Sequence, residues 1–161
     1  MTPSNLSRML ALIDEVFATR NDPAQLQVNE QVIAKLEQIH PATLSEYNEG
    51  NGPAVWILLI PTTTELMNLF LTGHISEQEL FDRTQPAMQY EAVYLCSATA
   101  LPEYRGKGHA KKLCLEAIEH IRSQHPLKAL FVWPFTKEGN ALAEKIAIQS
   151  GLPLKKVGNR Q

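Results

Sequence analysis

The 161-residue chain carries 15 Lys and Arg against 17 Asp and Glu, which gives a net charge of −2 at neutral pH. A chain of this length suits one domain with a substantial hydrophobic core, so we predict a single domain over residues 1–161. Acidic and basic residues are interspersed, which argues against a broad basic face and a nucleic-acid partner. The longest apolar run, residues 54–60, is far shorter than the roughly 20 residues that span a bilayer, so no membrane partner is expected.

The N-terminal segment, the cysteines and the histidines indicate neither secretion nor disulfide or metal chemistry. Asp14 and Glu15 interrupt the apolar positions of the N-terminal segment, unlike in a signal peptide, so we expect a cytoplasmic location. Cys96, in a predicted strand, and Cys114, on a predicted buried helix face, are typical of small apolar core residues. The five histidines show no paired spacing on one helix face and have no cysteine nearby, so no metal site is expected.

Two helices are predicted before Pro41. Ser4 can cap a first helix that ends near Arg20. Asp22 and Pro23 are typical of a cap and a first helical residue, so a second helix is predicted from there until Pro41 stops it. The apolar residues of the first helix are expected to form one buried stripe: Leu6, Met9, Leu10, Ile13, Val16 and Phe17. The residues of the second helix that are expected to face inward are Val32, Ile33, Leu36 and Ile39.

A β-hairpin and two short helices are predicted next. Residues 43–47 and 54–60 have the composition of strands, and the turn formers at residues 48–52 between them predict a hairpin. Two pairs of residues then have the spacing of a capping box before apolar residues, so two short helices are expected within residues 62–84. These pairs are Thr62 with Glu65 and Ser76 with Glu79.

Residues 105–110, Arg-Gly-Lys-Gly-His-Ala, join a strand-like run at residues 91–101 to an amphipathic helix. At the start of a helix the first N–H groups have no internal partner and the helix dipole is positive, so the backbone there can bind phosphate. Gly106 and Gly108 allow the main chain to approach a ligand closely. The alternative is a plain surface turn whose basic side chains are solvated.

Two well-known phosphate motifs do not fit this stretch. A P-loop needs a glycine where Leu101 stands and a Ser or Thr where Gly108 stands. A dinucleotide-binding fingerprint needs a third glycine where Lys111 stands. The stretch instead resembles motif A of the GNAT superfamily of acetyl-CoA-dependent N-acyltransferases, Gln/Arg-x-x-Gly-x-Gly/Ala, whose fixed positions are filled by Arg105, Gly108 and Ala110.

The resemblance continues on both sides of the motif. Residues 102–104, Pro-Glu-Tyr, match a lead-in that is common in the family. Residues 127–134 are predicted to form the next strand, residues 140–151 the next helix and residues 152–157 the last strand. In this order the segments extend the resemblance over about residues 89–158.

The resemblance implies an α/β fold with a mixed, mostly antiparallel central sheet and helices on both faces. It also implies acetyl-CoA as cosubstrate, a primary amine of a small molecule or peptide as acceptor, direct attack, and no metal. Three features depart from the family pattern: no convincing first strand precedes residue 20, the insert at residues 62–84 is longer than a simple turn, and only one strand fits after Gly151. Either a partner subunit, which predicts a homodimer, or a simplified sheet edge fills the place of the family's final hairpin.

In the family, the pantetheine arm of the coenzyme lies between the motif A strand and the following strand, as though it were an extra strand. A bulge near residues 97–100 is then expected to free an N–H for the thioester oxygen. Asn140 is expected at the start of the last helix, where it either contacts the coenzyme or makes a helix-start hydrogen bond. The residues implied in coenzyme binding are Ser97, Ala98, Thr99, Ala100, Arg105, Gly106, Lys107, Gly108, His109, Ala110 and Asn140.

Direct attack needs a neutral amine, and a lysine-like amine with a pKa of about 10.4 is protonated at neutral pH. Histone-type relatives use a glutamate near the start of the motif A strand as base; Glu91 is the acid there, one residue off their spacing, and a solvated strand-end acid is the alternative. Many relatives use a tyrosine on the last helix as acid, but Ala147 stands at that position. Tyr94 is a substitute acid, with packing in the sheet as the alternative.

The insert at residues 62–84 is expected to flank the acceptor entrance, with His74 and Glu77 as polar contacts to the amine; packing at the opposite end of the sheet is the alternative. Trp133 is expected in the pocket wall or the core. Two other classes of function compete with an acetyltransferase. One is a non-catalytic acyl-CoA-binding or regulatory domain, which the missing tyrosine permits, and the other is an interaction module built on the N-terminal helices.

Overall fold

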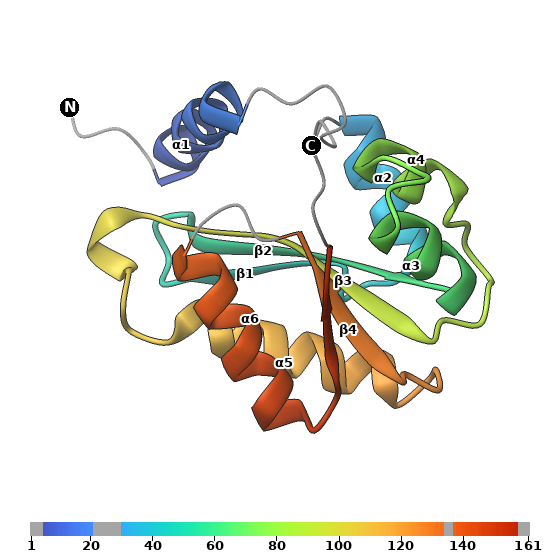
Figure 1. Cartoon of the computed structure of the whole chain (residues 1–161). Helices are drawn as coiled ribbons and strands as arrows, with labels where there is room; N and C mark the ends of the chain where they lie inside the picture. The colour runs from blue at the N-terminus through green and yellow to red at the C-terminus, as the bar shows by residue number, and fades with distance from the viewer. Residues whose placement is uncertain (1–4, 21–29, 134–136, 158–161) are drawn as a thin grey trace.

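A five-stranded sheet organises the structure, a computed structural model that describes residues 5–20, 30–133 and 137–157. The strands lie side by side in chain order (Figure 1). They are β1 (Leu44–Asn48), β2 (Pro53–Thr62), β3 (Ala92–Ala100), β4 (Ala129–Val132) and β5 (Leu154–Lys156). The helices are α1 (Asn5–Arg20), α2 (Glu30–Ile39), α3 (Thr64–Leu71), α4 (Glu77–Arg83), the 3-10 helix η1 (Pro102–Tyr104), α5 (His109–Arg122) and α6 (Lys137–Ser150).

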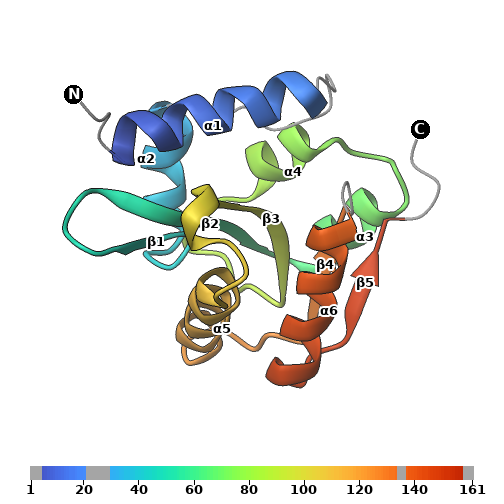
Figure 2. The same cartoon turned by 90° about the vertical axis from the view of Figure 1, so that its left-hand side faces the viewer.

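The helices cover both faces of the sheet, as predicted. Helices α1, α2, α3 and α4 lie over one face, and α5 and α6 lie over the other (Figure 1; Figure 2). The inner strand β2 is therefore buried along almost its whole length. Burial on both faces explains why residues 54–60 form an unbroken apolar run and not an alternating pattern. Buried side chains from α2, the sheet and helices α3–α6 form one connected core.

The sheet is mixed, as predicted. Strand β2 pairs antiparallel with β1 and with β3, whereas β4 pairs parallel with β3 and with β5. The antiparallel part is the longer one, because β2 and β3 pair over eight positions and each parallel pairing covers three. The one strand expected after Gly151 is β5, which extends the sheet directly beside β4.

The two N-terminal helices form as predicted, with an error in the expected buried stripe. In α1, Met9 is fully buried but Leu10 is 50% exposed, so the expectation that both face inward was wrong. Neighbouring helical residues point about 100° apart, so Leu10 points away from the side on which Met9 is buried. In α2, Ile33 is only partly buried. The buried residues of α2 are Val32, Leu36 and Ile39. The described residues do not include the expected cap Ser4, the helix start at residues 22–23, or the side chains of Leu6, Ile13, Val16 and Phe17.

The two capping predictions for the insert have different outcomes. Ser76 and Glu79 do form a capping box: the Glu79 N–H donates to Ser76 Oγ at 3.0 Å, and the Ser76 N–H donates to Glu79 Oε1 at 3.1 Å. Helix α3, however, is capped by Thr63 and not by Thr62, because Thr63 Oγ1 accepts from the N–H three residues later at 3.2 Å. Thr62 is the last residue of β2. Its buried hydroxyl makes a hydrogen bond with the Thr84 hydroxyl, with the two oxygens 2.7 Å apart.

The C-terminal elements differ from the prediction at their ends. Helix α6 begins at Lys137 and not at Asn140. Its first turn contains no apolar residue, so the periodic pattern starts later than the helix. Strand β4 is shorter than the predicted strand at residues 127–134, whose last residue lies outside the described chain.

Three histidines from different parts of the chain meet beside the ends of α2 and α5. The ring centroid of His40 lies 4.8 Å from that of His120 and 6.0 Å from that of His125. His40 is 4% exposed, and its Nδ1 accepts from the Ala42 N–H at 3.0 Å, so its Nε2 carries the proton and donates to Gln124 Oε1 at 2.6 Å. Burial lowers the pKa of His40 below its ordinary value; the Gln124 hydrogen bond opposes this shift, and the two neighbouring histidines add to it.

Acidification should therefore destabilise the fold through His40. The unfolded chain binds a proton at this residue with a pKa of about 6.5, whereas the folded chain keeps the ring neutral to lower pH. The free energy of unfolding then falls as the pH drops below about 6.5, by at most about 1.4 kcal/mol per pH unit for one proton. Urea unfolding of the parent and of His40→Asn, between about pH 5 and about pH 7.5, measures this slope.

The His40→Asn variant keeps a short acceptor for the Ala42 N–H and cannot titrate in this range, so its slope should be the shallower one. His74→Asn, at an exposed histidine of the insert, is the matched control and should keep the parent slope. Equal slopes for the parent and His40→Asn would show that His40 does not couple protonation to folding.

Candidate functional site

The predicted phosphate-binding stretch turns through two left-handed glycines between β3 and α5. Gly106 has a φ of 74° and Gly108 a φ of 81°, a conformation that residues with a side chain rarely adopt. Gly108 is the N-cap of α5, and its carbonyl accepts the first hydrogen bond of the helix from the Lys112 N–H at 3.0 Å. A Cβ at either glycine would meet no atom within 4 Å, so the space beside the turn is open.

The first turn of α5 leaves main-chain donors available. Within the described part of the chain, the N–H groups of His109, Ala110 and Lys111 have no hydrogen-bond acceptor. They lie at the positive end of the helix dipole, where backbone donors and dipole together favour an anion. The turn therefore has the main-chain arrangement on which the phosphate-binding prediction depends.

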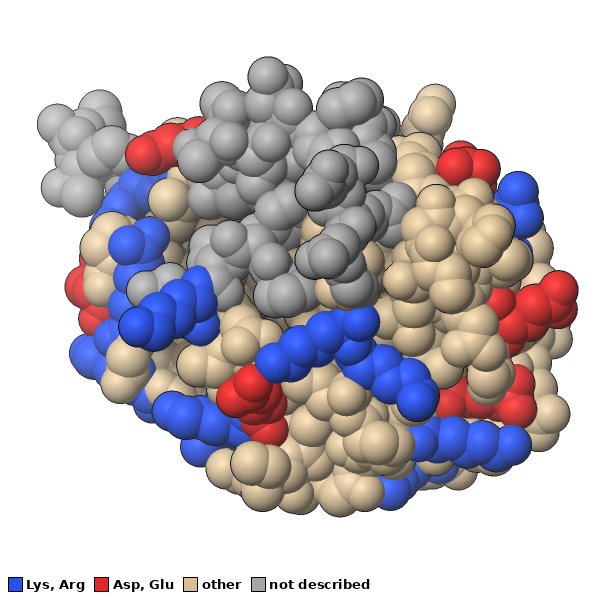
Figure 3. Space-filling view, viewed as in Figure 1, with Lys and Arg blue, Asp and Glu red and all other residues tan. Residues whose placement is uncertain are grey.

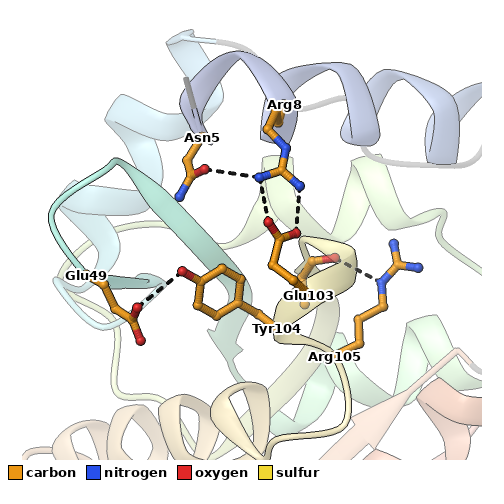
Figure 4. A network of polar contacts seen from close by, with 7 residues as sticks. Asn5, Arg8, Glu49, Glu103, Tyr104 and Arg105 are labelled. Carbon is orange, nitrogen blue, oxygen red and sulfur yellow. Dashed lines mark hydrogen bonds and ion pairs between the residues drawn. The ribbon is translucent and has the colours of Figure 1, made fainter. Parts of the chain in front are cut away.

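Basic side chains surround this turn. Arg105, Lys107 and Lys112 are exposed, and Lys111 is partly buried. The Arg105 Nε donates to the Ala100 carbonyl at 3.0 Å, and its two terminal nitrogens point away from that carbonyl (Figure 4). Figure 3 shows Lys and Arg side chains gathered at the left edge of the molecule, on the side where Figure 1 draws the loop between β3 and α5. The surroundings of the turn are therefore positive although the net charge of the chain is −2.

An ion pair fastens α1 to the residues just before the glycines. The two terminal nitrogens of Arg8 donate to the Glu103 carboxylate at 2.7 and 2.6 Å, and Nη1 also lies 3.3 Å from Asn5 Oδ1 (Figure 4). This bidentate pairing with Arg8 is the main reason that the pKa of Glu103 falls to about 2. The carboxylate beside the turn is thus charge-compensated throughout the neutral range.

The tip of the β1–β2 hairpin supports the turn from another side. Glu49 accepts a hydrogen bond from the Tyr47 hydroxyl at 2.5 Å. It accepts another from the Tyr104 hydroxyl at 3.2 Å (Figure 4). The His109 ring stacks on that of Tyr47, with centroids 4.0 Å apart and 18° between the planes. The hydrogen bond from Tyr47 is the main cause that lowers the pKa of Glu49. Sequence reasoning missed Tyr47 and Glu49, because no local pattern indicates that the hairpin tip meets this loop.

Strands β3 and β4 separate before they reach the loop. Their parallel pairing ends with Tyr94 opposite Phe131, whereas residues 97–100 of β3 pair with β2 alone in the described chain. A β-bulge inserts Cys96 into β3, immediately before the predicted stretch at residues 97–100. The first two residues of that stretch are exposed, in contrast to the buried beginning of the strand. Among the described residues, no strand pairs with the outer edge of β3 at residues 97–100, so this edge is open next to the glycine turn.

Asn140 is the fourth residue of α6, so it is not the residue that caps the start of the helix. Its Nδ2 donates to Glu144 Oε1 at 3.4 Å, while its Oδ1 is buried and has no donor among the described residues. An unsatisfied buried acceptor typically costs about 1–3 kcal/mol. Helices α5 and α6 both begin on the side of the molecule that carries the glycine turn (Figure 1). Asn140 Oδ1 is therefore an acceptor without a donor among the described residues, and its helix begins on the side that carries the glycine turn.

Glu91 lies just before β3, at the opposite end of the strand from the glycine turn. Its Oε1 accepts from the Thr64 N–H at 3.4 Å, and its Oε2 lies 3.3 Å from Lys128 Nζ. The Thr64 N–H, followed by Lys128, lowers the pKa of this carboxyl group. Glu91 is thus a carboxylate that joins the start of α3 to the strand region, and its charged form is stabilised.

The structure brings three of the predicted residues together and leaves one apart. The Tyr94 hydroxyl donates to Glu77 Oε2 at 2.5 Å, and both residues are 1% exposed. The Phe70 ring lies 4.9 Å from that of Tyr94 and 6.2 Å from that of the partly buried Trp133. His74 is exposed and its Nδ1 lies 2.7 Å from the hydroxyl of a nearby threonine, so His74 and Glu77 do not form one polar surface.

The described residues also bear on metal binding, on cysteine reactivity and on membrane-spanning helices. Among the described residues, no group of three or more His, Cys, Asp and Glu could hold a metal ion. Burial raises the pKa of Cys114 to about 12, as expected of a core thiol. In the same part of the chain, no helix combines the length and the apolar character needed to cross a membrane.

In comparisons with known proteins, the chain matches no protein-family model, no curated protein and no solved structure. The functional assignment therefore depends on the geometry of the site and on the resemblance of residues 105–110 to motif A.

The ion pair between α1 and the loop makes a direct prediction. The Glu103 carboxyl should titrate near its pKa of about 2 in the parent, and Arg8→Ala should return this pKa toward about 4.3, the ordinary value of glutamate. Because the folded pKa is depressed, the stability from this pair is present above the unfolded pKa and lost as the pH falls toward the folded one. NMR titration of the side-chain carboxyl carbons measures the shift.

Arg122→Ala is the matched control, because it removes another Arg–Glu ion pair, with Glu119, and should leave Glu103 unchanged. A Glu103 pKa that is the same in the parent and in Arg8→Ala would contradict the pairing of α1 with the loop.

Proposed function

We propose that this protein is a GNAT-type N-acetyltransferase that transfers the acetyl group of acetyl-CoA to a primary amine of a small molecule or peptide. The observation that carries the proposal is the continuity between the glycine turn, with its available main-chain donors, and the open edge of β3. A phosphate site alone suits many ligands. A phosphate site that continues into an open strand edge suits a ligand with a pyrophosphate at one end and an amide-bearing chain at the other, and coenzyme A is such a ligand.

The residues present suit two parts of coenzyme A, the pyrophosphate and the pantetheine arm. The N–H groups at the start of α5 suit the pyrophosphate, and the exposed side chains of Arg105 and Lys107 add positive charge. The edge at residues 97–100, open among the described residues, can pair with the pantetheine arm as with an added strand. Asn140 Oδ1, a buried acceptor without a donor among the described residues, can accept from a pantetheine N–H.

The proposed reaction is direct attack of a neutral amine on the thioester carbonyl. Negative charge then develops on the carbonyl oxygen, and preorganised donors stabilise it. We assign this role to main-chain N–H groups of residues 97–100, which follow the bulge in β3. The amine nitrogen loses a proton and the departing sulfur gains one, so the reaction needs a group that moves a proton but no metal or redox step. The cytoplasmic location stays a prediction from the sequence.

A non-catalytic acyl-CoA-binding domain is the second candidate, and Ala147 is the observation that favours it. This residue, where many enzymes of the resembled family carry an acidic tyrosine, is a buried core residue, and Glu91 is held by Thr64 and Lys128. Incubation with acetyl-CoA and a panel of primary amines distinguishes the two candidates. Release of free thiol that depends on the amine supports the enzyme, and binding of acetyl-CoA without release supports the regulatory domain.

Gly108→Asp should abolish coenzyme binding. It adds a side chain and a negative charge where the phosphates are proposed to lie, at a position with no neighbouring atom to disturb. Isothermal titration calorimetry with CoA measures the effect, and we expect a loss of affinity of at least about tenfold, or about 1.4 kcal/mol.

Gly73→Asp is the matched control. Gly73 has a φ of +80° and equally open surroundings, but it follows α3, so this variant has the same backbone strain and the same added charge away from the loop. It should bind CoA as the parent does. Equal affinities of a folded Gly108→Asp variant and the Gly73→Asp control would remove the glycine turn from the coenzyme site.

Glu91→Gln should have little effect on the rate. The pKa of Glu91 is lowered, so its carboxylate is a weak base, and its contacts join α3 to the strand region. Loss of a true general base typically costs about a hundredfold or more in kcat. We expect a far smaller change in kcat and an unchanged affinity for acetyl-CoA, in steady-state kinetics with Lys128→Gln as the control. A hundredfold loss, on the scale of general-base removal, in Glu91→Gln alone would identify Glu91 as the base.

A further inference from the structure

A buried acid–phenol pair lies at the inner end of the open edge of β3. Tyr94 is the last residue of β3 that pairs with β4, so it marks the point where the two strands separate. Its hydroxyl donates to Glu77 Oε2 at 2.5 Å, and both residues are 1% exposed. Carboxyl groups are rarely buried unless they are paired, because their removal from water is costly. A proton donor and a proton acceptor are thus held together, away from water, beside the proposed acyl site.

A purely structural role does not account well for this pair. Such a role would be to fasten the α3–α4 insert to the sheet. The insert already has a buried hydroxyl contact for this purpose, between Thr62 and Thr84 at 2.7 Å, and both of these residues are fully buried. In addition, Lys35 Nζ donates to the Phe81 carbonyl of α4 at 2.9 Å. Burying a carboxyl group is energetically costly, and apolar contacts could attach the insert to the sheet without that cost.

Aromatic side chains surround the pair, and one of them is partly exposed. Phe70 and Phe131 are fully buried and pack on the Tyr94 ring, with centroids 4.9 and 5.1 Å away. Trp133, whose ring lies 6.2 Å from that of Phe70, is partly exposed and so forms the rim of this aromatic cluster. A thioester held along the edge at residues 97–100, with its acyl end toward Tyr94, would lie where an amine that enters past Trp133 can reach it.

We infer that Tyr94 and Glu77 form the proton relay of the acetyl transfer, an inference that rests on the function proposed above. The amine nitrogen forms a bond to the thioester carbon and gives a proton to Tyr94 Oη, while the Tyr94 hydroxyl proton passes to Glu77 Oε2. The carbon–sulfur bond then breaks and its electron pair goes to sulfur. The proton returns from Glu77 through Tyr94 to the sulfur, so the proton lost by the amine ends on the thiol of CoA.

One relay therefore serves both halves of the reaction. It takes a proton during attack and returns a proton during departure, so no separate base or acid is needed. Such a relay would explain how the site works although Thr64 and Lys128 hold Glu91. It would also explain why Ala147 can stand where many enzymes of the resembled family carry a tyrosine as general acid. Tyr94 is the residue that meets the substrate, and Glu77 acts through it.

The test uses the full chain with acetyl-CoA and the primary amine that turns over fastest in the panel. Tyr94→Phe keeps the ring, and Glu77→Gln keeps an oxygen acceptor for the Tyr94 hydroxyl but cannot take a proton. Each should lower kcat by about a hundredfold or more and leave acetyl-CoA affinity unchanged. The pH dependence of kcat that the relay predicts for the parent should be lost in both variants. Because the two residues act in series, the double variant should lose no more than either single one.

Thr62→Val is the structural control, because it removes the other buried polar contact of the insert and should keep kcat and its pH profile. The relay is wrong if the folded Tyr94→Phe and Glu77→Gln variants keep the parent kcat. It is also wrong if the two losses in kcat multiply in the double variant. Either result leaves the proposed function standing. If one single variant fails to fold by circular dichroism, the other decides. A parent that neither binds acetyl-CoA nor acetylates any amine overturns the proposed function, and the relay with it.

Discussion

The short pairing between β3 and β4 is the constraint on which the candidate site depends. The two strands pair over three positions, and among the described residues the β3 stretch at residues 97–100 has a partner strand on one side only. If β4 extended alongside, its main chain would occupy the donors and acceptors of that edge. The separation therefore creates a single line of features: the Tyr94–Glu77 pair at its inner end, an open strand edge along it, and the left-handed glycine turn at its outer end.

The glycine turn is exposed, so contacts from distant parts of the chain must fix its shape. The Arg8–Glu103 ion pair joins it to α1, and hydrogen bonds from Tyr47 and Tyr104 to Glu49 join it to the hairpin tip. Exposed ion pairs add little to global stability, typically about 0–1 kcal/mol. Their effect here is on orientation, because they fix the residues before α5 and neutralise a carboxylate that would otherwise oppose an anion. Helix α1 and the β1–β2 hairpin thus support the turn, although neither contains a site motif.

The features that could be predicted are those that arise from short stretches of sequence. The order of helices and strands, the capping box at Ser76 and the glycine turn each depend on residues within a few positions of one another. Features that depend on packing were missed or misjudged. From the sequence, Thr62 is as good a helix cap as Thr63, but in the structure it belongs to β2. In a helical pattern, Leu10 likewise cannot be distinguished from its buried neighbour Met9. Glu77 and Tyr94 were both singled out, yet only the fold brings them within hydrogen-bond distance.

The far edge of the sheet bears on the predicted homodimer. Strand β5 is the outer strand of the described sheet, and its central residue Lys155 is exposed, as is Lys156. Two-fold antiparallel pairing of two copies through this strand would set Lys155 opposite its own counterpart, and like charges at that spacing destabilise a strand pair. The charges therefore favour a simplified edge over completion by a second copy through β5. An apolar contact between copies would need a different surface; on α6, Ile148 is 80% exposed. It is part of an open groove of about 340 Å³ lined by Glu144, Ala147, Ile148, Leu152 and Leu154.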